Sequence, residues 1–132
     1  MYRRDLLTAE IQKLAQALAR IMGLKQQGKT LEADNSLDEL IAHEFGILFS
    51  DLLASGTEDF EAFLTEKNFP AEKLDMFSQF LYLKFNPAEP SENTRSLAEK
   101  LQLIYSTLEI KHHIINMINL DRQKTVQNYL KN

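Results

Sequence analysis

The fold is decided by residues 23–33, which read GLKQQGKTLEA. Gly23 to Thr30 fit the phosphate-loop pattern G-x-x-x-x-G-K-[ST], which would make Lys29 and Thr30 ligands of a nucleotide. The same residues also fit a tight turn between two antiparallel helices, in which Gly28 ends the first helix. The first interpretation predicts a nucleotide-binding enzyme, whereas the second predicts a helical hairpin.

The surrounding sequence favours the hairpin. A phosphate loop follows a β-strand, but the apolar residues before Gly23 recur at steps of four and three, which is helical spacing. The four residues between the glycines are good helix formers. We therefore expect a helix over residues 2–27, a left-handed Gly28, an exposed Lys29 and a second helix over residues 30–45. The helical apolar positions are Leu7, Ile11, Leu14, Leu18 and Ile21.

Composition narrows the class of protein. The chain has 132 residues, of which 44% are hydrophobic and 26% charged, as expected for one globular domain spanning 1–132. It contains no cysteine, so disulfides and thiolate metal sites are excluded. Its net charge of −4 and its pI of about 5.4 argue against nucleic-acid binding. No apolar run reaches membrane-spanning length and no signal peptide is visible, so we expect a cytoplasmic protein without membrane contact.

The rest of the chain also has helical spacing, and no alternating strand pattern exceeds four residues. We expect short helices near residues 47–54, with Ser50 as cap, and after Thr57 as cap. An apolar helix follows Pro70 over residues 74–85, and a polar loop with two prolines covers residues 86–93. A long helix is predicted over residues 94–118, with a break at 119–121 before a last, mostly polar helix.

The segment from Leu24 and Lys25 through Gly28 and Lys29 to Glu32 and Ala33 resembles the helix–turn–helix of a tetratricopeptide-type repeat. Residues 74–108 resemble a second such hairpin. Together with Tyr2-x-x-Asp5, they are similar to a family of uncharacterised small bacterial proteins. The resemblance implies an all-α bundle or short solenoid of two tetratricopeptide-like antiparallel hairpins with short connecting helices. It implies no activity.

Two patterns with possible chemistry lie on the predicted helices. Glu109-x-x-His112 is the spacing of carboxylate-bridged metal bundles, and Glu39 with His43 is a second carboxylate–imidazole pair. Such a site needs further ligands, and the ordinary interpretation is a surface pair, with His113 beside Ile110. We therefore expect no metal or other cofactor and no catalytic residue. The alternative is a metal- or nucleotide-dependent enzyme that uses these residues or Lys29 and Thr30.

The excess of apolar residues is the strongest indication of function. The helix over residues 74–85 is apolar almost all round, and the apolar stripe of the long helix widens over residues 110–118. Either the short middle helices cover this surface or a second copy of the chain does. We predict a protein-interaction module that forms a homodimer. The candidate interface residues are Leu74, Phe77, Phe80, Leu81, Tyr82, Ile110, Ile114 and Met117.

Overall fold

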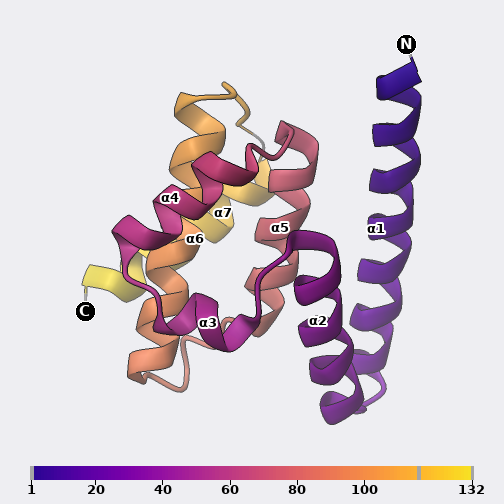
Figure 1. Cartoon of the computed structure of the whole chain (residues 1–132). Coiled ribbons are helices and arrows are strands. Elements are labelled where there is room, and N and C mark those ends of the chain that lie inside the picture. Colours follow the sequence, from indigo (N-terminus) through magenta and orange to yellow (C-terminus); the bar gives the residue numbers. More distant parts are fainter. Residues whose placement is uncertain (1, 116, 132) are drawn as a thin grey trace. The chain divides into compact units, whose positions relative to one another are not determined.

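The computed structural model describes residues 2–115 and 117–131, without the side chains of Tyr2 and Arg3, and within these ranges it is all-helical (Figure 1). This confirms the predicted all-α class. The described chain forms two compact units, which divide in sequence between Ile47 and Leu48. The prediction of a single domain stays a prediction, and each unit is described by itself. The helices are α1 (Tyr2–Gln26), α2 (Thr30–Phe45), α3 (Phe49–Ala54), α4 (Thr57–Lys67), α5 (Ala71–Lys84), α6 (Glu92–Ile110) and α7 (Met117–Lys131).

The first unit is the helical hairpin that residues 23–33 predict. Gly28 has a φ of 80°, and the N–H of Lys29 donates to the carbonyl of Leu24 at 2.9 Å. The N–H of Gly28 donates to the carbonyl of Lys25 at 3.1 Å, so the end of α1 is a complete Schellman motif. Lys29 is exposed, as predicted. The buried side chains are Leu14, Ala17 and Ile21 on α1 and Ala33, Leu37, Ile41 and Phe45 on α2.

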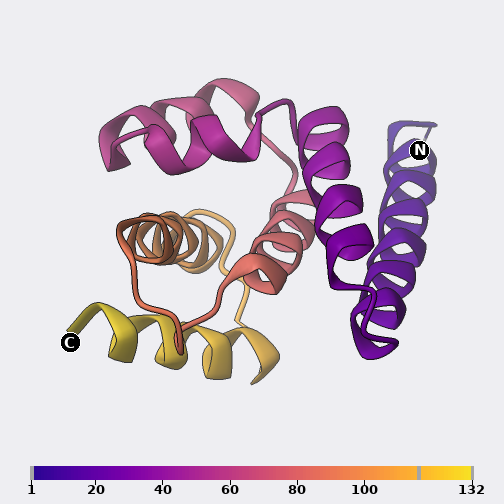
Figure 2. The same cartoon turned by 90° about the horizontal axis from the view of Figure 1, so that it is seen from below.

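The second unit is organised around α6. Helices α3, α4, α5 and α7 all contact it. In Figure 2, α6 is seen nearly end-on, with α4 on one side, α7 on the opposite side and α5 closing a third side. Its apolar positions, spaced by three and four, are accordingly buried. The buried residues of α6 are Leu97, Ala98, Lys100, Leu101, Ile104, Tyr105 and Leu108.

An aromatic cluster joins α4 to α5 inside this unit. The ring of Phe77 on α5 lies 6.3 Å from that of Phe60 on α4 and 5.9 Å from that of Phe69 in the connection. Phe63 stacks on Phe60 at 5.8 Å. Such pairs add about 0.5–1.5 kcal/mol each to the effect of burial. They hold the connection between the two helices against α4 and α5, and this connection forms part of the pocket described below.

The predicted long helix over residues 94–118 is wrong. Helix α6 begins at Glu92, with Ser91 as cap accepting the N–H of Thr94 at 3.1 Å, and it ends at Ile110. His113 has a φ of 57°, and the N–H of Ile114 donates to the carbonyl of Leu108 at 2.9 Å. This bond spans six residues, one more than the corresponding bond of a Schellman motif, and the left-handed residue of the helix end is a histidine in place of glycine.

After this break the chain reverses, and α7 packs back along α6. The ring of Tyr129 near the end of α7 lies 5.5 Å from that of Phe85, and Arg95 at the start of α6 donates to the carbonyl of Leu130 at 3.4 Å. The predicted break at 119–121 is therefore wrong, since these residues lie inside α7.

Two predicted helix caps are also wrong. Leu48 and Gly56 occupy the N-cap positions of α3 and α4, and neither cap is made by a side chain. Ser50 and Thr57 instead lie within the first turn of their helices. The predicted start near Pro70 is close, because Pro70 is the residue that precedes α5.

Candidate interaction surface

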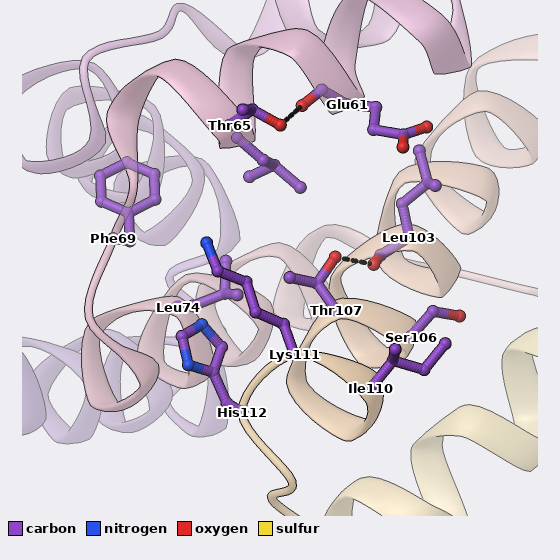
Figure 3. Close-up of a pocket in the computed structure, with 11 residues that line it drawn as sticks. Glu61, Thr65, Phe69, Leu74, Leu103, Ser106, Thr107, Ile110, Lys111 and His112 are labelled. Carbon is purple, nitrogen blue, oxygen red and sulfur yellow. Dashed lines mark hydrogen bonds between the residues drawn. The ribbon is translucent and has the colours of Figure 1, made fainter.

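A pocket of about 320 Å³ opens between the connection of α4 to α5 and the end of α6 (Figure 3). Its apolar part comes from Leu64, Phe69, Leu74, Leu103 and Ile110. The size is at the low end of that seen in ligand sites, which is roughly 300–1,000 Å³. The remaining lining residues are polar or charged: Glu61, Thr65, Ser106, Thr107, Lys111 and His112.

Charged groups lie on two sides of this pocket. Figure 3 shows the Glu61 carboxylate beside Leu103 and the Lys111 ammonium on the side of Phe69. Lys111 Nζ donates to Asn68 Oδ1 at 3.1 Å, which uses one of its three donors. The pocket is therefore acidic at one end and basic at the other.

Two of the three hydroxyl groups of the pocket, those of Thr65 and Thr107, are bonded to their own helices. Thr107 Oγ donates to the carbonyl of Leu103 at 2.8 Å, and Thr65 Oγ donates to the carbonyl of Glu61 at 3.0 Å. Local bonds of this kind are common for threonine within a helix. They leave an apolar floor between two charged ends.

An exposed apolar patch begins at the edge of the pocket. The side chains of Ile110 and Met117 are 75% and 76% exposed, although both are large and hydrophobic. Of the nine exposed large hydrophobic residues in the described chain, five fall within residues 110–120, so they are concentrated at one place. We call these five the α6–α7 patch: Ile110, Ile115, Met117, Ile118 and Leu120.

The structure separates the candidate interface residues into three groups, which are buried, half-buried and exposed. Leu74, Phe77, Phe80 and Leu81 on α5 are buried, and of these four only Leu74 lines the pocket. Phe80→Glu would therefore test the core and not an interface. Tyr82 is half-buried, with the guanidinium of Arg122 lying 4.8 Å from the centre of its ring. Ile114 is half-buried as well, whereas Ile110 and Met117 are exposed.

The predicted chemical patterns are not assembled into sites. Glu109 and His113 are exposed, the latter against the expectation that it packs beside Ile110, while His112 is half-buried at the pocket. Within residues 2–115 and 117–131, no three histidine, aspartate or glutamate side chains are grouped closely enough to hold a metal ion.

The phosphate-loop alternative fails on backbone geometry. Gly23 lies inside α1, and no strand precedes it. The N–H groups between Gly23 and Gly28 therefore belong to the last turns of a helix and cannot form an anion cradle at a helix N-terminus. Glu39 and His43 line a shallow groove between α1 and α2 together with Lys13 and Arg20.

A buried lysine, missed by sequence reasoning, ties α6 to the end of α3. Lys100 is 2% exposed, and its Nζ donates to the carbonyl of Ser55 at 2.5 Å and to Ser96 Oγ at 2.9 Å. Ser96 Oγ in turn donates to the carbonyl of Leu53 at 2.7 Å. Burial lowers the pKa of the Lys100 side chain, and the neighbouring Glu99 carboxylate opposes this shift. The missed signal is the position of Lys100, three residues after Leu97 and thus on the buried face.

A polar network fixes α7 against α5. Asn119 Nδ2 donates to Asp75 Oδ1 at 2.7 Å, and Gln79 Nε2 donates to Asp75 Oδ2 at 3.0 Å. Tyr105 on α6 is 3% exposed, and its hydroxyl has no hydrogen-bond partner in the described part of the chain. Burial raises the pKa of the Tyr105 phenol, while nearby Arg122 lowers it. Neither the network around Asp75 nor the buried hydroxyl of Tyr105 was predicted from the sequence.

Comparisons with known proteins do not assign the chain to a family. None of the described helices has the length and apolar character needed to cross a membrane. The chain has no match among protein-family models, among curated proteins or among solved structures.

Proposed function

We propose that this chain is a protein-interaction module and that it forms a homodimer through the α6–α7 patch. The observation that carries the proposal is the exposure of Ile110 and Met117, together with their apolar neighbours at the same helix connection. Each large side chain left in water forgoes roughly 1.5–3 kcal/mol that burial would provide. Several exposed apolar side chains within one short segment are typical of a contact with another protein.

The proposal includes the tetratricopeptide-like arrangement. Two features support it: the glycine turn between α1 and α2, and the packing of α5 on α6 with the short helices α3 and α4 before them in the chain. Membership of a family of small bacterial proteins and a place in the cytoplasm belong to the same proposal. They follow from the resemblance and the composition of the sequence.

A charge placed in the patch tests the dimer. Met117 is the first residue of α7, where a carboxylate is favourable for the helix, so Met117→Glu retains the fold. Leu31 is a matched control, because it is 75% exposed and is the second residue of α2. We expect wild type and Leu31→Glu to have the mass of two chains by light scattering at micromolar concentration, and Met117→Glu that of one.

Two results would contradict the proposal. A wild-type mass of one chain at micromolar concentration would exclude the dimer. A dimer that survives Met117→Glu but dissociates with Leu31→Glu would place the interface on a different surface of the chain.

A further inference from the structure

We infer that the pocket beside Ile110 is the centre of the interface and that its occupant is the exposed Ile110 side chain of a second copy. This inference rests on the proposed homodimer and adds which residues meet across it. The first argument is continuity, because Ile110 belongs both to the lining of the pocket and to the exposed α6–α7 patch. A partner that buries Ile110 therefore contacts both the patch and the edge of the pocket.

The second argument is the chemistry of the lining. The hydroxyls of Thr65 and Thr107 donate to carbonyls of their own helices, so these donors are already used. The floor is apolar and includes the buried side chains of Leu64, Phe69 and Leu74. Such a pocket gains most from an apolar occupant, and the exposed Ile110 of a second copy provides one.

The third argument is charge. Glu61 lies at one end of the pocket and Lys111 at the other (Figure 3). A two-fold axis that crosses the pocket perpendicular to the line from Glu61 to Lys111 places each end of one copy opposite the other end of its partner, because an isologous interface pairs residue i with j and j with i. Glu61 of each copy then faces Lys111 of the other, so the surface is complementary to itself.

Both side chains have hydrogen-bonding capacity left for that pairing. The Glu61 carboxylate is exposed, and within the described residues it takes part in no hydrogen bond or ion pair. Lys111 is exposed and uses one donor on Asn68, so further donors remain for a carboxylate. The dimer thus contains two symmetry-related Glu61–Lys111 pairs that flank an apolar centre.

Charge reversal tests this pairing. Glu61→Lys and Lys111→Glu each replace two attractive pairs by two repulsive ones, which raises the Kd of the homodimer by about tenfold or more. When the two variants are mixed, every facing pair is attractive again, so a heterodimer forms with near wild-type affinity. Affinity tagging of one variant and native mass spectrometry measure the heterodimer fraction. The matched controls are Glu66→Lys on α4 and Lys124→Glu on α7, which are exposed and lie outside the pocket lining.

The absence of cysteine permits an independent test. Ile110→Cys introduces the only thiol, so any disulfide it forms joins two chains. We expect mild oxidation to yield a covalent dimer much faster for Ile110→Cys than for Leu31→Cys, which is equally exposed.

The outcomes separate this inference from the proposed function. If wild type is a dimer that Met117→Glu dissociates, but charge reversal changes neither the Kd nor the heterodimer fraction, only the pocket pairing is wrong. Equal oxidation rates for the two cysteine variants would also refute the pairing. If wild type has the mass of one chain, both are refuted, and the pocket faces a partner of another kind.

Discussion

Tyr105→Phe isolates the effect of one buried hydroxyl. Tyr105 lies on α6, is 3% exposed, and has no hydrogen-bond partner for its hydroxyl within the described chain. A buried polar group without a partner costs about 1–3 kcal/mol, because the unfolded chain bonds the same group to water. Removing the hydroxyl while keeping the ring therefore raises the free energy of unfolding at pH 7 by about 1 kcal/mol.

The same substitution has a pH dependence of known sign. Burial raises the pKa of the Tyr105 phenol in the folded state, whereas in the unfolded chain it ionises near pH 10. Above pH 10 the unfolded state releases a proton that the folded state keeps, so stability falls as pH rises. The slope is about 1.4 kcal/mol per pH unit. At pH 11 the gain from Tyr105→Phe is therefore larger than at pH 7, by about 1 kcal/mol.

Urea unfolding followed by far-ultraviolet circular dichroism measures both quantities, since the described chain is all-helical. Wild type and Tyr105→Phe are compared at pH 7 and pH 11. A destabilisation of more than about 1 kcal/mol at pH 7 would show that the hydroxyl is hydrogen-bonded after all. An equal difference at both pH values would show that the folded phenol titrates as in water.

Two further substitutions test the helix ends. Gly28→Ala should lower the free energy of unfolding by about 1 kcal/mol, because the φ of 80° is strained for alanine. The effect is one of backbone strain alone, since nothing lies within 4 Å of an added Cβ. An unchanged urea midpoint would contradict this expectation. Lys100→Met should destabilise by about 2 kcal/mol, because it leaves the carbonyl of Ser55 without its charged donor, and thermal melting beside the exposed control Lys124→Met measures the difference.

The sequence alone predicts the hairpin of the first unit in detail. Its signals are local: the spacing of Leu14 and Ile21 is helical, and Gly28 is the residue type that adopts a positive φ at least cost. In this hairpin, the spacing of the apolar residues and the glycine at the helix end are both local features of the sequence. A pattern over residues 2–45 therefore contains the information that determines the two helices and the turn.

The reversal after α6 follows no local rule. Apolar residues continue at helical spacing past Ile110, and the left-handed residue that ends the helix is His113 and not glycine. The contacts that favour the break are distant in sequence, such as the bond from Asn119 to Asp75. The energy of these contacts outweighs the small cost of the left-handed histidine, and a window along the chain does not contain them.

The position of the candidate interaction surface is likewise decided by tertiary structure. Sequence marked the apolar helix over residues 74–85 and the stripe near residue 110 as equal candidates, because both have surplus apolar positions. Packing buries Phe80 and leaves Ile110 exposed. The pocket combines Glu61 on α4 with Lys111 after α6, fifty residues further along the chain. The periodicity of the sequence determines which side chains share a helix face. Which faces meet depends on how the helices pack, and this packing is determined by the summed energy of contacts between distant segments.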